Sequence, residues 1–173
     1  KRSYTWKQVY DRSIKFASAL EKHGIKPGDT VSVMAANTPE LFEAHYSVPM
    51  TGAVLNAINT RLDSKTVGYI LKHADAKALI VDRQFHDVVK KALESFGKKI
   101  LIIDIVDKQA DLNDSEKIGE FEYESFLEKG DVNYVWKRPE DEWQAISLNY
   151  TSGTTGNPKG AVYHHRGSYL MST

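Results

Sequence analysis

A short run of small and hydroxyl-bearing residues near the end of the chain has the composition of a phosphate-binding loop. Between Tyr150 and Gly160 there are three glycines, four Ser or Thr hydroxyls and one lysine, Lys159. Glycine lets backbone N–H groups turn toward an anion, because it lacks a Cβ and tolerates positive φ. Hydroxyls donate hydrogen bonds to phosphate oxygens, and lysine adds a mobile positive charge. The run therefore predicts a site for a polyphosphate.

The spacing within this run differs from that of a Walker A loop. A Walker A loop places Ser or Thr directly after a Gly-Lys pair, whereas Lys159 follows Pro158 and precedes Gly160. Pro158 also disfavours helical backbone in the residue before it. Residues 145–150 and 161–164 both have the character of strands, so we expect the run to join two strands as a hairpin. On composition alone, a polar hairpin without a ligand is an equal alternative.

The elements before this run alternate between amphipathic helices and short apolar strands. Helix starts are marked by Thr5, by Thr38 with Pro39 after it, and by Asp63 or Ser64. The pattern predicts helices over 6–23, 39–48, 64–74 and 85–96, and strands over 30–35, 52–58, 78–81 and 100–103. Continuous apolar strands separated by helices are typical of a buried parallel sheet. The fold class is therefore α/β: a layered, mostly parallel sheet with flanking helices.

Other side chains are expected to have ordinary structural roles. On the helix after Thr38 the apolar side is assigned to Leu41, Phe42, His45, Tyr46 and Val48, with a kink or break at Pro49. The acidic stretch 104–130 predicts a surface excursion, with a short amphipathic piece over 123–127. Its aspartates lack the Gly and closing Glu of an EF-hand loop, so we expect solvated surface at Asp104, Asp107, Asp111 and Asp114. The tryptophans Trp6, Trp136 and Trp143 are expected in the core or at its edge, and His45, His164 and His165 in packing or on the surface.

Composition excludes several classes of protein. The 173 residues carry 23 basic and 23 acidic side chains, which argues against a nucleic-acid partner, because such domains are usually basic. No cysteine is present, so disulfides and thiolate chemistry are excluded. No apolar stretch reaches the length of a membrane span. The length suits one domain, although the chain stops just after a helix start near Gly167.

The run resembles the phosphate-binding loop of the adenylate-forming (AMP-binding) superfamily. That superfamily includes acyl-CoA synthetases, aryl-CoA ligases, firefly-type luciferases and peptide-synthetase adenylation domains. The match is Thr151-Ser152-Gly153-Thr154-Thr155-Gly156-Asn157-Pro158-Lys159-Gly160. The similarity spans nearly the whole chain, at 4–6, 28–31, 37–40, 52–56, 59–62 and 160–166, and is weaker over 104–141. The residues at 52–56 and 59–62 are similar to the corresponding stretch in the acyl-CoA synthetase branch.

The resemblance implies a ligand set and a reaction. The β- and γ-phosphates of ATP would be cradled by Thr151, Ser152, Gly153, Thr154, Thr155 and Gly156, and neutralised by Lys159. Mg²⁺ would accompany ATP, with coenzyme A as co-substrate and a fatty, medium-chain or aromatic carboxylic acid as the activated partner. The product would be an acyl adenylate and then an acyl-CoA thioester. In the family, the adenylation lysine and the metal-liganding glutamate lie downstream of this loop, so we expect no catalytic residue and no metal ligand within residues 1–173.

The resemblance also implies an incomplete domain. Residues 1–173 would form the N-terminal part of the AMP-binding domain, ending just after the phosphate-binding loop, with the small C-terminal domain absent. We expect these residues alone to be inactive. Two alternatives are a non-catalytic nucleotide-binding module and a truncated product unable to fold independently. An intracellular location in the cytoplasm, peroxisome or mitochondrion is expected, while the oligomeric state is left open.

Overall fold

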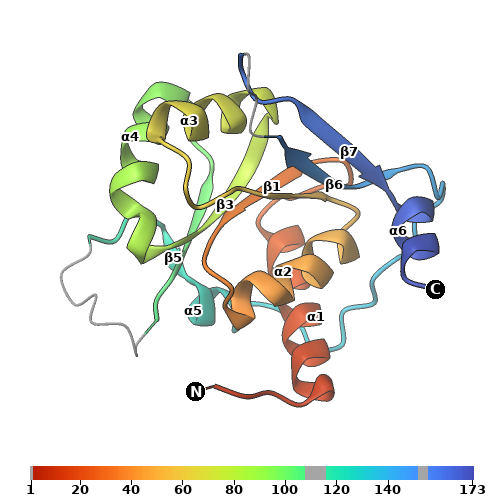
Figure 1. The fold of residues 1–173 in the computed structure, drawn as a ribbon. Coiled ribbons are helices and arrows are strands. Elements are labelled where there is room, and N and C mark those ends of the chain that lie inside the picture. The colour runs from red at the N-terminus through yellow and green to blue at the C-terminus, as the bar shows by residue number, and fades with distance from the viewer. Residues whose placement is uncertain (1, 108–115, 152–155) are drawn as a thin grey trace.

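A single seven-stranded sheet organises the protein, and helices flank it (Figure 1). The computed structural model describes residues 2–107, 116–151 and 156–173. The strand order is β5-β4-β3-β1-β2-β6-β7. Neighbouring strands are parallel from β5 to β6, and only the β6–β7 pair is antiparallel. The predicted α/β fold with a mostly parallel sheet is confirmed.

The strands and helices alternate along the chain as the apolar pattern predicts. The strands are β1 (Thr30–Met34), β2 (Val54–Ala57), β3 (Ala76–Asp82), β4 (Leu101–Ile105), β5 (Phe121–Glu122), β6 (Ala145–Tyr150) and β7 (Gly160–His164). The helices are α1 (Trp6–Lys22), α2 (Pro39–Met50), α3 (Ser64–His73), α4 (His86–Phe96), α5 (Tyr123–Leu127) and α6 (His165–Met171), with a 3₁₀ turn at Arg83–Phe85. Several boundaries coincide with the predicted ones and the others differ by one or two residues, because helix and strand ends carry the weakest sequence signals.

Local chemistry explains where the helices start and stop. The Thr5 side chain accepts a hydrogen bond from the backbone N–H of Gln8, whose side chain in turn accepts from the backbone N–H of Thr5. Asp63 caps α3 by accepting from the backbone N–H of Thr66. α2 ends one residue after Pro49, which confirms the expected break.

The centre of the sheet, around β1 and β3, is buried on both faces. Buried side chains of α1, α2 and α5 form one apolar cluster, which includes Phe16 and Phe126, with strand residues such as Val31. Helices α3 and α4 form a second cluster with Leu79, among others, on the opposite face. Burial on both faces explains why the central strands are continuous apolar runs rather than alternating ones.

The expected apolar side of α2 is wrong in part. Phe42, His45 and Tyr46 are exposed, and the buried face of the helix instead carries two glutamates, Glu40 and Glu43. Both glutamates are paired, Glu40 with an arginine near the N-terminus and Glu43 with one on α1. Periodicity marks apolar positions and cannot register a buried charge whose partner lies on another helix.

The acidic stretch 104–130 is also more buried than expected. Asp104 belongs to β4 and is completely buried. Its carboxylate accepts hydrogen bonds from the backbone N–H groups of Ile118 and Gly119 at 3.2 and 3.0 Å, which replace its lost bonds to water. The piece over 123–127 is helical as predicted, but Tyr123 and Phe126 lie in the core rather than on the surface. Asp111 and Asp114 lie outside the described residues.

The tryptophans lie at the surface rather than in the core. Trp6 is 75% exposed and Trp143 63% exposed, while Trp136 is just above one-third exposed. Trp6 starts α1 and meets Phe42 of α2 with ring centroids 6.1 Å apart. Trp143 packs against the ring of His164 at the end of β7. The exposed fractions of Trp6 and Trp143 therefore contradict the expected place in the core or at its edge.

Candidate phosphate-binding hairpin

The predicted loop joins β6 to β7 in an antiparallel hairpin, as expected. Pairing runs from Ala145 opposite His164 to Tyr150 opposite Gly160. Just beyond the last pair, the backbone N–H of Thr151 donates to the carbonyl of Lys159 at 3.0 Å. The backbone N–H of Lys159 donates in turn to the Thr151 hydroxyl at 3.4 Å. These bonds close the base of the loop and bring its first and last predicted ligands together.

The described part of the loop faces solvent. Thr151, Gly156 and Lys159 are all exposed, and a Cβ at Gly156 would meet no atom within 4 Å. Ser152, Gly153, Thr154 and Thr155 lie outside the described residues, so their predicted contacts with phosphate stay predictions. An exposed lysine ammonium at the base of the hairpin is accessible to an anionic ligand. Within the described ranges, the donor types fit the phosphates of a nucleotide.

Two side-chain contacts link β6 to β2 and to α3, and the sequence reasoning missed both. The Asn56 amide of β2 donates to the carbonyl of Leu148 at 2.8 Å. The Tyr150 hydroxyl lies 2.7 Å from Nδ1 of His73 at the end of α3. A polar residue inside the apolar run of β2 was the only sequence signal for the first contact. The second had no signal, because 77 residues separate its partners.

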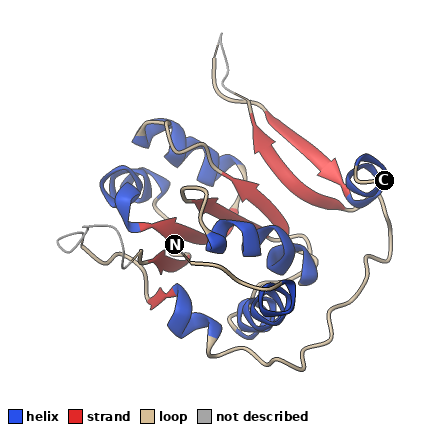
Figure 2. Cartoon of the chain, turned by 60° about the horizontal axis from the view of Figure 1, so that its bottom comes forward, coloured by secondary structure: helices blue, strands red, loops and turns tan. Residues whose placement is uncertain are grey.

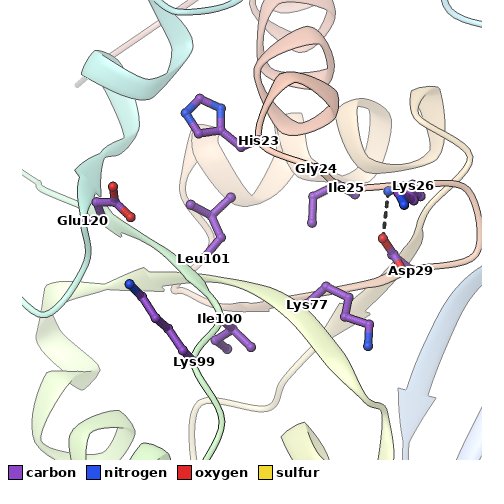
Figure 3. A pocket seen from close by; sticks show the side chains of 10 residues that line it. All are labelled: His23, Gly24, Ile25, Lys26, Asp29, Lys77, Lys99, Ile100, Leu101 and Glu120. Atoms are coloured by element: carbon purple, nitrogen blue, oxygen red, sulfur yellow. Dashed lines mark hydrogen bonds between the residues drawn. The ribbon is translucent and has the colours of Figure 1, made fainter.

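A cavity of about 530 Å³ lies away from this hairpin (Figure 3). It opens beside the starts of β1, β3 and β4, and its lining includes no residue of β6 or β7. Charges of both signs surround it, from Lys26, Lys77, Lys99, Asp29 and Glu120. Because ligands of open α/β sheets bind at the carboxyl ends of the strands, this cavity at the amino ends is not assigned to the phosphate site.

A buried ionic cluster connects α1, α2 and α5, which the sequence reasoning also missed. The Glu43 carboxylate is fully buried and accepts from Nε of Arg12 at 2.6 Å and from the Tyr123 hydroxyl at 2.9 Å. Burial raises the pKa of Glu43, and the hydrogen bonds from Arg12 and Tyr123 oppose that rise. Burial acts against the Arg12 charge too, but bonds to Glu124 and Glu43 outweigh it and raise the pKa of Arg12. The cluster belongs to the sheet face opposite Tyr150, so we assign it to packing.

The histidines near the hairpin have structural roles. Nδ1 of His164 accepts from the backbone N–H of Gly167 at 3.0 Å and so caps α6. Burial lowers the pKa of His165, the first residue of that helix. His45 is exposed and contacts the carbonyl of Leu41 in its own helix. Among the described residues, no group of three or more His, Asp or Glu side chains is arranged to hold a metal ion.

Comparison with known proteins decides the family. The family model described as AMP-binding enzyme matches residues 1–173, which is the whole chain. The chain belongs to the AMP-binding enzyme family. The chain is 50% identical over 181 residues to an acetate–CoA ligase of Humulus lupulus. It is 46% identical to a peroxisomal acetate/butyrate–CoA ligase of Arabidopsis thaliana. The alignments cover 99% of the chain and 32% of each relative, so the chain spans about a third of their length.

Solved structures show the same fold. An anthranilate CoA ligase in complex with anthranoyl-AMP superposes with a TM-score of 0.84 at 24% identity. The superposition covers 95% of this chain and 30% of the ligase. A benzoate CoA ligase from Burkholderia xenovorans gives a TM-score of 0.80 at 24% identity, with 98% and 31% covered. No described helix of this chain has the length and apolar character needed to span a bilayer.

Proposed function

We propose that residues 1–173 are the N-terminal third of an ATP-dependent carboxylate–CoA ligase and carry its site for the ATP phosphates. The observation that supports this most is the Thr151–Lys159 closure at the end of β6, within a chain 50% identical to an acetate–CoA ligase. The rest of the AMP-binding domain and a small C-terminal domain would follow these residues. The substrate class would be a small carboxylic acid, with fatty, medium-chain and aromatic acids as the range to test.

The reaction proposed has two steps. A carboxylate oxygen attacks the α-phosphorus of ATP, the bond to the bridging oxygen breaks, and pyrophosphate leaves. A thiol, coenzyme A, then attacks the carbonyl carbon of the acyl adenylate and releases AMP. The first step replaces a poor leaving group by a good one. The protein contributes to it mainly by positioning the reactants and by stabilising negative charge.

The hairpin residues would act on the leaving pyrophosphate. Hydroxyls and backbone N–H groups at Thr151, Ser152, Gly153, Thr154, Thr155 and Gly156 would hold the β- and γ-phosphates. The Lys159 ammonium would offset their charge, which is consistent with its exposure beside Thr151. Mg²⁺ usually binds through substrate phosphates and one or two carboxylates rather than a cage of protein ligands. A bound Mg²⁺ would supply further neutralisation of the phosphates.

The test is ATP–pyrophosphate exchange by the full-length protein with a panel of carboxylic acids. We expect exchange with at least one short or medium-chain acid, and a Lys159→Ala variant with the KM for ATP raised about ten- to a hundred-fold, the effect of losing one charged hydrogen bond. Lys91→Ala removes an equally exposed lysine from α4 and is the matched control. A full-length protein without exchange for any acid, or a Lys159→Ala variant that behaves like Lys91→Ala, would refute the proposal.

Residues 1–173 alone are proposed to be inactive. The hairpin and α6 expose large apolar side chains, with Val162 63% and Met171 87% exposed. This exposure favours the second alternative, in which the isolated residues fold poorly. A urea melt with ANS binding would show a broad transition and strong dye fluorescence in that case. A sharp transition with ATP binding that Lys159→Ala weakens would instead support the nucleotide-binding module.

The compartment is a separate proposal. A relative at 46% identity is named as peroxisomal, which makes the peroxisome the first of the expected locations to test. Imaging of the tagged full-length protein, with the tag at the N-terminus, against peroxisomal, mitochondrial and cytoplasmic markers would decide among them.

A further inference from the structure

The β6–β7 hairpin has few backbone links to the rest of the sheet. β6 pairs with β2 at Leu55 opposite Ser147, whereas its pairing with β7 is continuous from Ser147 to Tyr150. In Figure 2 the two strands form a ribbon at one side of the sheet. Thr151 and Lys159 therefore depend for their position on whatever else holds β6.

Asn56 is a buried side chain that holds the middle of β6. Its Oδ1 accepts from the Ser32 hydroxyl at 2.9 Å, and both residues are completely buried. This bond fixes the orientation of the amide, so that its nitrogen donates to the carbonyl of Leu148 at 2.8 Å. The side chain thus replaces a backbone ladder bond at a point where β2 and β6 share little pairing. Its donor would otherwise be buried without a partner, which is unfavourable.

His73 holds the end of β6. Its Nδ1 lies 2.7 Å from the Tyr150 hydroxyl, and the two rings meet edge to face with centroids 5.7 Å apart. The ring of His73 also stacks on Tyr69, one turn earlier on α3. Burial raises the pKa of Tyr150, so its hydroxyl remains neutral and able to donate. Tyr150 is the residue directly before Thr151.

Gly160 leaves room for a side chain of β6, Leu148. A Cβ at Gly160 would lie 2.8 Å from Cδ1 of Leu148, which is too close without a shift. The Tyr150 ring, opposite Gly160 in the hairpin, would lie 3.5 Å from that Cβ, an ordinary van der Waals distance. The glycine in the predicted motif therefore has a packing role in addition to any role toward a ligand.

We propose that Asn56 and His73 are positioning residues for the phosphate site: through Leu148 and Tyr150 they hold β6 so that Thr151 and Lys159 meet ATP in a fixed place. This inference rests on the proposed function. Neither residue touches the ligand. Without these two contacts, Thr151 and Lys159 would have to be ordered when ATP binds. The free-energy cost of that ordering would lower the affinity for ATP and leave the acid site unaffected.

The test measures KM for ATP, KM for the acid and kcat in the full-length protein. We expect Tyr150→Phe and His73→Leu each to raise KM for ATP about three- to ten-fold, the effect of one ordinary hydrogen bond. The double variant should be no worse than the worse single variant, because both remove the same bond. His73→Gln, whose amide can bond the same hydroxyl, should recover part of the affinity.

Two further variants separate positioning from general stability. Tyr163→Phe removes a hydroxyl from the neighbouring strand, where the side chain is 49% exposed, and should leave KM for ATP within about twofold of wild type. Asn56→Leu should raise KM for ATP as the His73 variant does. If Asn56→Leu does not fold, Ser32→Ala tests the same contact, since it releases the Asn56 amide from its fixed orientation.

The outcomes distinguish this inference from the function on which it rests. A wild-type protein without exchange activity overturns the proposed function and the inference with it. An active wild type whose Tyr150, His73 and Asn56 (or Ser32) variants keep the wild-type KM for ATP overturns the inference alone. So does a fall in kcat at unchanged KM, because variants that merely fold less well lose active enzyme and not affinity.

Discussion

Removal of Arg12 should expose how strongly the fold depends on one buried ion pair. Arg12→Met keeps most of the aliphatic volume on α1 and removes the guanidinium that donates to Glu43 at 2.6 Å. Glu43 is fully buried, so its carboxylate would keep one donor, the Tyr123 hydroxyl. Breaking a buried pair by removing one partner typically costs about 3–5 kcal/mol. The lost contact with half-exposed Glu124 adds at most about 1 kcal/mol.

The loss should depend on pH in a defined direction. Without Arg12, burial is left as the dominant influence on Glu43 and raises the pKa of its carboxyl further above the unfolded value of about 4.3. The folded variant then binds a proton that the unfolded chain does not bind above that value, so its stability falls as pH rises. The deficit relative to wild type is therefore largest near neutral pH and shrinks as the pH approaches 5.

Urea unfolding of the full-length protein at pH 7.5 and at pH 5 measures both effects. Lys7→Met on the same helix is the control, because it breaks an exposed pair with Asp11 and should cost roughly 0.5 kcal/mol. Adding Glu43→Gln to Arg12→Met should recover more than half of the loss, since the neutral amide still accepts from Tyr123. A deficit below about 1 kcal/mol, or one equal at both pH values, would contradict the reasoning.

Four further predictions concern other elements. Thr5→Ala should cost about 1 kcal/mol in urea unfolding, and Thr5→Ser should recover most of it, because the serine hydroxyl can still cap α1. Leu71→Ala should cost about 2–5 kcal/mol, because Leu71 is fully buried on the inner face of α3. Gly130→Ala should cost more than Gly97→Ala: a Cβ at Gly130 would lie 1.8 Å from the carbonyl oxygen of Lys15, whereas Gly97 has open space and only its φ of +69° to strain, about 1–2 kcal/mol. Burial, with a hydrogen bond to Glu21, raises the pKa of Tyr134 to about 12. Stability should therefore decline as pH rises past about 10, the unfolded value, and Tyr134→Phe should remove part of that decline and one late-titrating phenol from the absorbance titration.

Most of the fold could be predicted from apolar periodicity and from the residues that cap helices. Strands buried on both faces appear as continuous apolar runs, and Thr5, Asp63 and Pro39 mark helix starts that the structure confirms. The hairpin followed from the strand character of residues 161–164, and Pro158 argued against a P-loop helix with Lys159 in its first turn. These features depend on residues close together in the chain, and such local patterns can be identified in a single sequence.

Buried polar contacts were missed because they depend on distant partners. Arg12 falls within the apolar stripe of α1 between Val9 and Phe16, and Glu43 lies beside Ala44 on the buried face of α2. A charge within an apolar stripe was thus the available signal for each. Their pairing joins positions 31 residues apart, which periodicity cannot reveal. Asp104 follows the same rule, since its partners are backbone N–H groups 14 and 15 residues downstream.

The position of β6 has a consequence for the order in which the protein folds. Paired residues of strands β1 to β4 are 23 to 47 positions apart in the chain, whereas the Asn56–Leu148 contact joins residues 92 apart. Closing a longer loop is entropically more costly, and non-local pairings tend to form later. During synthesis the first four strands emerge before β6, so the phosphate hairpin would dock onto a sheet that already exists. Pulse-labelled hydrogen exchange should then protect the amides of β1 and β3 before those of β6, and simultaneous protection would contradict this order.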